Sequence, residues 1–284
     1  MPSATDLQPQ ADHPTRHTLV RPDCTLSYLD FGGTGPILIA LHGHFGCARN
    51  FARLAQDLSP AHRVIALDQR GHGWSTHPED CSRAAYISDI LALADQLSPA
   101  QPVDLLGHSL GGVNAYQFAA RHPQRIRRLI VEDIGTAVRR TAPLGLDWPR
   151  RFASLWLLQA SLAPSGIGHD QHFIDSLNEF EDGWGFRFDP AWIARSQAAV
   201  QGDWSQAWQA VSAATLLIRG RHSWATTRHN LEQMAHQHPD CELIELEAGH
   251  TVHNDQPTAF AEAVAAFLAA QQGKTHAARL TQTT

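Results

Sequence analysis

The chain has 284 residues, which is enough for one large domain or two small ones. Hydrophobic residues make up 43% and charged residues 18%, and this composition excludes an intrinsically disordered chain. The 22 Lys and Arg against 28 Asp and Glu give a formal charge of −6 at pH 7, so we expect no nucleic-acid partner. The 18 histidines are unusually many and leave metal binding open.

The sequence contains no stretch that approaches the roughly 18 consecutive apolar residues needed to cross a bilayer. Residues 1–17 are polar and contain three prolines, unlike the apolar segment of a secretory signal. We therefore expect a cytoplasmic protein with no membrane partner. The four cysteines are widely spaced and form no CxxC pair, which predicts free thiols in a reducing compartment.

Short β-like runs alternate with helical patterns, as is typical of a mostly parallel sheet covered by helices on both faces. Several runs are almost continuously apolar, such as Ile37–Leu41, because buried parallel strands have no solvated face. The predicted strands are 26–31, 36–41, 63–68, 102–106, 126–132, 215–219 and 242–246. The predicted helices are 50–58, 83–97, 111–121, 227–237 and 257–271. We predict a doubly wound α/β core over residues 16–134 and 213–272.

The interval 135–212 breaks this alternation, since it has no clear strand and holds six of the eight tryptophans. A gap of this length is too long for a bare loop in a compact domain. We therefore predict an inserted, mainly helical cap. Its tryptophans are either the core of that cap or part of a substrate pocket. The tails at 1–15 and 273–284 are predicted to be disordered.

The segment Val103–Gly112 is an apolar strand that continues into Gly-His-Ser-Leu-Gly and then a helix. This is the G-x-S-x-G nucleophile elbow, in which a sharp turn exposes the serine at the edge of the sheet. Ser109 is therefore the candidate nucleophile. The alternative is a glycine turn that happens to contain a serine.

A serine hydroxyl becomes a good nucleophile when a neighbouring base takes its proton and a carboxylate orients that base. The sequence Ala248-Gly-His-Thr-Val-His253 follows the last predicted strand, so it would lie at the same edge of the sheet as Ser109. His250 is the candidate general base, and His253 is the competitor.

A second loop at this edge comes from Ile39–Gly46, where a strand ends in a His-Gly turn. The backbone N–H groups of His44 and Leu110 are candidates for an oxyanion hole. His42 and His44 could instead form a His-x-His metal pair. However, no third ligand follows at a recognisable spacing, and the chain has no HExxH motif. We therefore expect neither a metal nor another cofactor.

Four motifs in this order resemble the α/β-hydrolase superfamily over roughly residues 18–272. They are LHGHFG (41–46), DQRGHGWS (68–75), GHSLGG (107–112) and AGHTVH (248–253). The resemblance is specific for the fold and much less so for the substrate, because the superfamily includes esterases, thioesterases, lipases, peptidases, dehalogenases, epoxide hydrolases and lyases.

The resemblance also guides the search for the acid. In many relatives a G-x-x-D pattern follows the strand that is predicted here at 215–219, but this chain has Gly220-Arg-His-Ser223. In some members, including a group of small esterases, the acid follows an earlier strand, which here ends in Glu132-Asp133. The resemblance implies Asp133 as the acid and Ser223 as an auxiliary hydroxyl. Glu132 is the runner-up, since adjacent strand residues point to opposite faces. The alternative is that Asp133 caps a turn.

The elbow serine separates this chain from the dehalogenases and epoxide hydrolases of the superfamily, which use an aspartate there. Hydroxynitrile lyases use a lysine near the site, whereas Lys274 is the only lysine here. The resemblance therefore implies a serine hydrolase that cleaves small carboxylic esters or thioesters through an acyl-enzyme. The alternatives are a cofactor-free haloperoxidase or perhydrolase and a non-catalytic small-molecule receptor on the same fold.

The aromatic residues of the cap predict an apolar acyl pocket. Candidate pocket residues, within and beyond the cap, are His108, Trp148, Trp156, Trp184 and Trp224. Basic residues of the same interval either meet an anionic leaving group such as a CoA phosphate or form a solvated face. These basic residues are Arg139, Arg140, Arg150 and Arg151.

Overall fold

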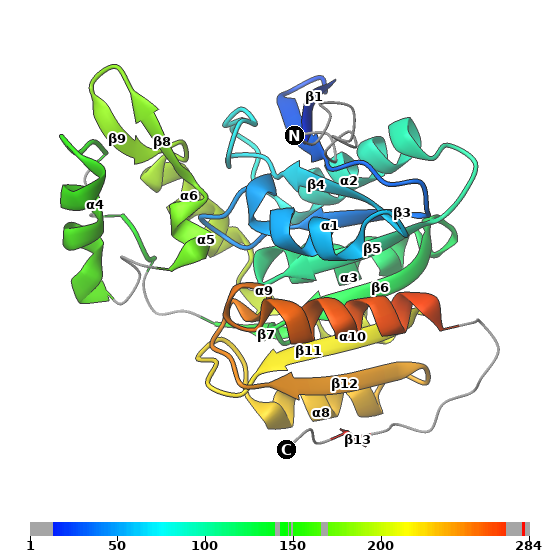
Figure 1. Ribbon diagram of the computed structural model, residues 1–284. Helices are drawn as coiled ribbons and strands as arrows, with labels where there is room; N and C mark the ends of the chain where they lie inside the picture. Colours follow the sequence, from blue (N-terminus) through cyan, green and yellow to red (C-terminus); the bar gives the residue numbers. More distant parts are fainter. Residues whose placement is uncertain are drawn as a thin grey trace, which may run out of the picture.

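The computed structural model describes residues 14–139, 143–146, 148, 150–165, 170–270 and 280–281. In these residues, helices cover both faces of one large, mostly parallel sheet, so the predicted fold class is confirmed (Figure 1). The strand order is β1-β2-β4-β3-β5-β6-β11-β12-β13. The strands are β1 (Thr15–Val20), β2 (Thr25–Asp30), β3 (Ile37–Leu41), β4 (Arg63–Asp68), β5 (Val103–His108), β6 (Ile126–Glu132), β11 (Ala214–Gly220), β12 (Cys241–Leu246) and β13 (Leu280–Thr281).

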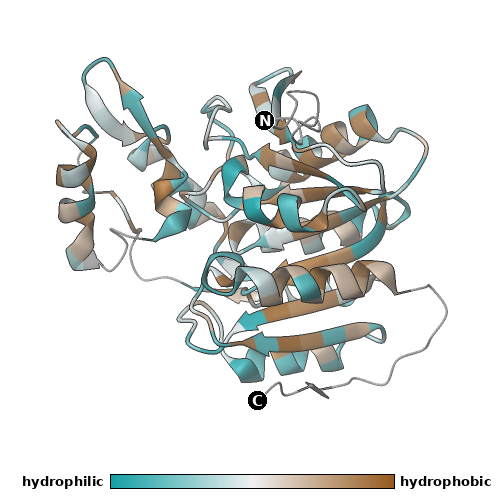
Figure 2. Ribbon diagram, viewed as in Figure 1, coloured by the Kyte–Doolittle hydropathy of each residue, from teal (hydrophilic) through white to brown (hydrophobic). Residues whose placement is uncertain are grey.

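The sheet divides the apolar side chains into two layers. Along β3, Ile39 and Leu41 belong to one buried cluster, whereas Leu38 and Ala40 belong to the other, as expected from the period-two alternation of a strand. The first layer contains apolar side chains of α2 (Arg83–Leu97), α3 (Leu110–Arg121) and α8 (Arg228–His236). The second contains those of α1 (Ala52–Leu58) and α10 (Pro257–Ala269). Figure 2 shows the hydrophobic residues concentrated along the central strands.

Among the described strands of the large sheet, pairing is antiparallel only at one edge, where β1 and β2 form a hairpin and β2 pairs with β4. The strand β1 was not predicted, because it is largely exposed and shows no apolar alternation. The tails predicted to be disordered lie outside the described residues, except for 14–15 and 280–281. There the prediction is wrong at Thr15 and at Leu280–Thr281, which belong to strands.

Residues 135–212, here called the cap segment, lie between β6 and β11. Their helices are α4 (Leu155–Leu162), η3 (Ala163–Ser165), α5 (Gln171–Ile174), α6 (Pro190–Ala199) and α7 (Ser205–Gln209). Their strands are β7 (Ala137–Val138), β8 (Leu177–Phe180), β9 (Gly183–Phe186) and β10 (Gly202–Asp203). The expectation of an interval without strands is therefore wrong. The hairpin β8–β9 turns at Gly183, whose φ of 122° suits glycine.

The cap tryptophans have different environments. Trp192 is buried and donates its indole N–H to the carbonyl of Pro78 over 2.5 Å. Trp208 is also buried and donates to the carbonyl of Met234 over 2.9 Å. Trp156 on α4, in contrast, is 71% exposed. Two of the six are thus core residues, as the first of the two sequence-based interpretations expects.

Of the remaining short helices, η1 (Ala48–Phe51) and α9 (Val252–Asp255) follow the carboxyl ends of β3 and β12, whereas η2 (Pro123–Arg125) directly precedes β6. Among the described residues, no helix combines the length and apolar character that crossing a membrane requires. The carboxyl ends of β3, β5, β6 and β11 meet at one edge of the sheet, which is where ligands bind in open α/β sheets.

Candidate active site

Ser109 occupies a sharp turn between β5 and α3. Its backbone has φ 53° and ψ −115°, a region that non-glycine residues rarely adopt and that is associated with functional strain. The turn needs two glycines because the backbones approach so closely. A Cβ on Gly107 would lie 2.2 Å from the carbonyl oxygen of Gly111, and a Cβ on Gly111 would lie 2.1 Å from that of Leu41. The geometry is therefore that of a nucleophile elbow.

His250 and Asp133 lie beside Ser109 in a continuous hydrogen-bonded chain. The Nε2 atom of His250 is 3.0 Å from the Ser109 hydroxyl, and Nδ1 is 2.7 Å from Oδ2 of Asp133. Because the carboxylate can only accept, the ring carries its proton on Nδ1 and presents Nε2 as an acceptor to the serine. The structure thus brings together the three residues that the sequence analysis selected as nucleophile, base and acid.

Asp133 is fully buried, and its carboxylate receives two further hydrogen bonds. The backbone N–H of Gly220 donates to Oδ1 over 3.0 Å, and the hydroxyl of Ser223 donates to Oδ2. Ser223, the predicted auxiliary hydroxyl, therefore bonds the same oxygen of Asp133 as Nδ1 of His250 does. The turn after β11, which carries no carboxylate of its own, therefore supplies donors that hold the carboxylate from β6.

Glu132 and His253, the two runners-up, form a separate pair. The Glu132 carboxylate accepts the backbone N–H of His253 over 2.9 Å and its Nδ1–H over 2.8 Å. Both side chains are buried. Burial opposes a charge on the imidazole, but the charge of Glu132 and its hydrogen bond raise the pKa of His253 above the ordinary value. Neither residue is bonded to Ser109 through its side chain.

His108 lies behind His250 rather than in a pocket. Its Nε2–H donates to the backbone carbonyl of His250 over 2.9 Å, and its ring centroid is 4.7 Å from that of His250 and 5.2 Å from that of His253. Burial and the neighbouring imidazoles keep its pKa well below the usual range, so the ring is neutral. The prediction that His108 lines the substrate pocket does not match this buried position.

His172 is a residue of the site that the sequence analysis missed. It comes from α5 in the cap segment and its Nε2–H donates to the carbonyl of His44 over 2.8 Å. Burial lowers its pKa to about 3, so the ring is neutral. The ring centroid lies 5.5 Å from that of His108. No sequence pattern marked this histidine, because its hydrogen bond to His44 joins segments more than a hundred positions apart.

The two candidate oxyanion donors lie on adjacent loops. Leu110 is the first residue of α3, where the backbone N–H has no acceptor within the helix. His44 follows Gly43, and a Cβ on Gly43 would lie 3.1 Å from Cβ of Ser109, so the His-Gly turn is packed against the elbow. Nε2 of the His44 ring is 3.1 Å from the hydroxyl of Ser196 on α6.

The ring nitrogens of His42 are both occupied by backbone groups. Nδ1–H donates to the carbonyl of Gly43 over 2.7 Å, and Nε2 accepts the N–H of Gln69 over 3.1 Å. Burial lowers the pKa of His42 to about 3. In the part of the chain that the structure describes, no group of three or more His, Cys, Asp or Glu is arranged to hold a metal ion.

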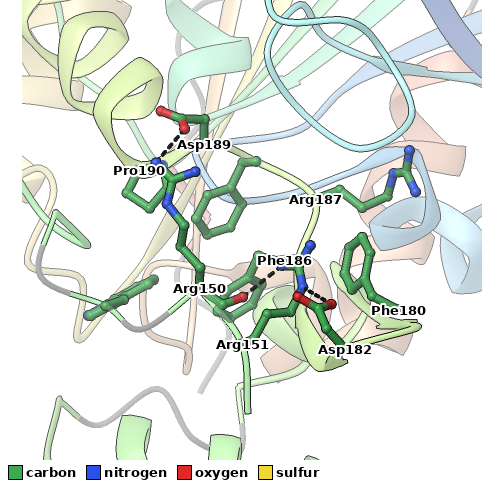
Figure 3. Close-up of a pocket in the computed structure, with 10 residues that line it drawn as sticks. Arg150, Arg151, Phe180, Asp182, Phe186, Arg187, Asp189 and Pro190 are labelled. Carbon is green, nitrogen blue, oxygen red and sulfur yellow. Dashed lines mark hydrogen bonds and ion pairs between the residues drawn. The ribbon is translucent and has the colours of Figure 1, made fainter.

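A cavity of about 290 Å³ lies in the cap segment, and none of the three catalytic candidates lines it (Figure 3). Two ion pairs line the cavity, one between Arg150 and Asp189 and one between Arg151 and Asp182. Its lining residues are Trp148, Arg150, Arg151, Phe180, Asp182, Phe186, Arg187, Phe188, Asp189 and Pro190. The two arginines therefore already have carboxylate partners. Arg140 lies outside the described residues.

Two aromatic residues that line this cavity pack against Phe45 of the His-Gly loop. Phe45, which follows His44, lies 5.2 Å from Trp148 and 5.3 Å from Phe188 between ring centroids. Trp148 is thus the one predicted pocket residue that lines the described cavity. Trp184 is half-buried on β9 beside Phe152, and Trp224 is 65% exposed with its ring 4.7 Å from that of His250.

Comparisons with known proteins agree with this architecture. Residues 36–166 match the family model described as the alpha/beta hydrolase fold. The chain is 30% identical to the sn-1-specific diacylglycerol lipase ABHD11 of Mus musculus over 263 residues, which cover 86% of this chain and 85% of the relative. The chain belongs to the α/β-hydrolase family. This α/β hydrolase is also 28% identical to 2-(acetamidomethylene)succinate hydrolase of Mesorhizobium japonicum, over 83% of the chain and 89% of the relative.

Solved structures show the same fold. The crystal structure of E-2-(acetamidomethylene)succinate hydrolase superimposes with a TM-score of 0.82 at 24% identity. The match covers 91% of this α/β hydrolase and 100% of the other chain. The thioesterase domain from the curacin biosynthetic pathway gives a TM-score of 0.73 at 20% identity and covers 89% of this chain and 99% of its own. At these identities the likeness concerns the fold.

Proposed function

We propose that this α/β hydrolase is a serine hydrolase that cleaves carboxylic esters or thioesters through an acyl-enzyme. The observation that carries the proposal is the chain of two hydrogen bonds, 3.0 Å and 2.7 Å long, which joins Ser109 to His250 and His250 to Asp133. Relatives named as a lipase and a succinate-derivative hydrolase support hydrolytic chemistry.

In the first half of the reaction, His250 accepts the proton of Ser109 at Nε2 as Oγ attacks the carbonyl carbon. Asp133 holds the ring through Nδ1 and stabilises the imidazolium. The tetrahedral intermediate then collapses, the bond to the leaving group breaks, and His250 returns the proton to the departing oxygen or sulfur. In the second half, water loses a proton to His250 and attacks the acyl-serine. The second tetrahedral intermediate collapses, the bond between Oγ and the acyl carbon breaks, and His250 returns the proton to Oγ, which releases the acid and free Ser109.

We propose that the N–H groups of His44 and Leu110 stabilise the oxyanion. Leu110 supports this role because its N–H is at the start of α3, where the helix dipole also favours negative charge. His44 supports it because its turn is packed against Ser109 and its carbonyl is fixed by His172. Each such donor contributes about 10² to 10³ in rate in hydrolases.

We propose that residues 135–212 act as the cap over an α/β core of residues 16–134 and 213–272. Contacts from the cap to the catalytic loops support this division of roles, in particular those of His172 and Ser196 with His44. The exposed ring of Trp224 beside His250 is suited to contact the acyl chain or leaving group of a small-molecule substrate. We place the enzyme in the cytoplasm, where its four free thiols would stay reduced.

The test is hydrolysis of a panel of p-nitrophenyl esters and acyl-CoA thioesters of increasing acyl length by the wild type and by Ser109→Ala. We expect turnover by the wild type and a loss of about 10⁵- to 10⁶-fold in kcat for the variant. Equal turnover by the folded variant would contradict the serine mechanism. Absence of any turnover by the wild type would favour a receptor, and peracid formation from an acid and peroxide would favour a perhydrolase.

A further inference from the structure

Two consecutive carboxylates at the end of β6 each hold one histidine of the same loop. Asp133 bonds Nδ1 of His250, and Glu132 bonds Nδ1 of His253 at the start of α9. The proposed function uses the first pair and leaves the second without a role. The second pair is completely enclosed, since the side chain of Glu132 is 0% exposed and that of His253 is 3% exposed.

Glu132 is bonded to both catalytic loops at once. Its backbone carbonyl accepts the N–H of Ser109 over 3.0 Å. Its carboxylate accepts the N–H and the ring Nδ1–H of His253, three positions after His250. A displacement of this residue would therefore move the nucleophile and the base relative to each other.

His108 provides a third connection. It directly precedes Ser109 and donates from Nε2 to the backbone carbonyl of His250. Its ring is in contact with the rings of both His250 and His253. The imidazole of His253 therefore supports His250 through His108.

The surroundings enclose His253 and favour its charged form. The ring of His253 is in contact with Phe51 of η1, Phe260 of α10 and His172 of α5. Asp170 and Asp175, which flank α5, also favour its charged form. Removing one partner of a buried ion pair leaves the charge of the other uncompensated, which is strongly destabilising.

We propose that Glu132 and His253 form a positioning pair, which fixes the distance between Oγ of Ser109 and Nε2 of His250 without touching the substrate. This inference rests on the proposed function, because a positioning pair has an effect on rate only if Ser109 and His250 react. A change of about 1 Å in such a distance costs up to about 10²-fold in rate.

The test compares Glu132→Gln and His253→Asn with Asp104→Asn. Asp104 is a matched control: its buried carboxylate pairs with Arg127 across the same two strands, β5 and β6, at their opposite end. Three quantities are measured on folded protein: kcat and KM for a p-nitrophenyl ester, the rate of labelling of Ser109 by a fluorophosphonate, and the downfield proton NMR signal of His250 Nδ1–H. Asparagine at 253 retains a donor near Nδ1, so it should be the milder change.

We expect Glu132→Gln to lower kcat by about 10- to 100-fold and the labelling rate in parallel, with KM within about twofold and a shifted downfield signal. His253→Asn should lower kcat less, and Asp104→Asn should retain wild-type kcat even if it is less stable. The inference is overturned if both site variants keep kcat within about twofold of the wild type, or if Asp104→Asn loses as much kcat as they do. A wild type that is not labelled at all would overturn the proposed function and this inference with it.

Discussion

The pairs Asp133–His250 and Glu132–His253 have nearly the same local chemistry and very different surroundings. In both, a buried carboxylate from the end of β6 accepts Nδ1–H of a histidine from the segment between β12 and α10. The His250 side chain is 14% exposed and presents Nε2 to Ser109, whereas His253 is sealed by aromatic rings. The access of Nε2 to Ser109 and to the solvent-facing side, rather than the bond between the acid and the histidine, therefore distinguishes the candidate proton carrier His250 from the buried His253.

The largest expected difference between the pairs appears when each carboxylate is replaced by its amide. Asp133→Asn should lower kcat by about 10⁴-fold, because the amide no longer selects the tautomer with Nδ1–H or stabilises the imidazolium. The fall in kcat of Glu132→Gln should be at least about 100-fold smaller than that of Asp133→Asn. Steady-state kinetics on both variants check this, and the opposite ranking would make Glu132 the acid.

Acid should unfold the protein through its neutral buried histidines. Burial lowers the pKa values of His42, His72, His108 and His172 below the ordinary 6.5. Below pH 6.5 the unfolded chain therefore binds protons that the folded chain does not, and stability falls as pH falls. Each such histidine contributes about 1.4 kcal/mol per pH unit. Urea unfolding between pH 7 and 4.5 should show this slope in the free energy of unfolding. His172→Gln should reduce the slope by about 1.4 kcal/mol per pH unit, the contribution of one histidine.

The second pair should have the opposite dependence on pH. Because the pKa of His253 is raised, its stabilisation is complete below the ordinary value of 6.5 and is lost as pH rises through the raised pKa. The stability of the wild type should therefore decline on the alkaline side, and the stability of His253→Asn should not show this decline. Thermal unfolding of the two proteins from pH 6 to pH 9 measures the difference, and parallel curves would contradict it.

Ser223→Ala tests the support of the first pair. The substitution removes one hydrogen bond to the carboxylate of Asp133 and leaves those from Gly220 and His250. A hydrogen bond to a charged group is worth about 1.5 to 3 kcal/mol, so we expect kcat to fall by about 10- to 100-fold. A variant with unchanged kcat would show that the hydroxyl is dispensable for holding the acid.

The smallest effect is expected at Trp224, which is in contact with His250 from the exposed side. Trp224→Ala should raise KM several-fold for esters with long acyl chains and leave kcat for short ones nearly unchanged, since the exposed ring offers apolar surface to the acyl chain. A KM series over acyl length checks this. A uniform fall in kcat instead would indicate that the ring orients His250.

The sequence was sufficient for the parts of the fold that depend on local pattern. Near-continuous apolar runs predicted the central strands within one or two residues, as for 63–68 and 126–132. The glycines at 107 and 111 predicted the elbow because close backbone approach leaves no alternative there. The strand β1 and the hairpin β8–β9 escaped prediction, since neither has a strong apolar alternation and both depend on pairing partners.

The site was harder to predict because the side-chain directions at 132 and 133 depend on how β6 ends. Asp133 follows the last residue of the strand and has φ 53°, so simple alternation along a strand could not specify its direction. The partnership of Glu132 with His253 and the approach of His172 join segments more than a hundred positions apart. Such contacts are products of topology, which a sequence pattern does not contain.

The most direct test of the central claim is the position of a covalent adduct. Wild-type protein is treated with a fluorophosphonate and digested, and the peptide masses are mapped. We expect a single stoichiometric adduct on Ser109, which forms much more slowly in Asp133→Asn and is absent in Ser109→Ala. Folded wild-type protein that hydrolyses esters but carries no adduct on Ser109 would contradict it.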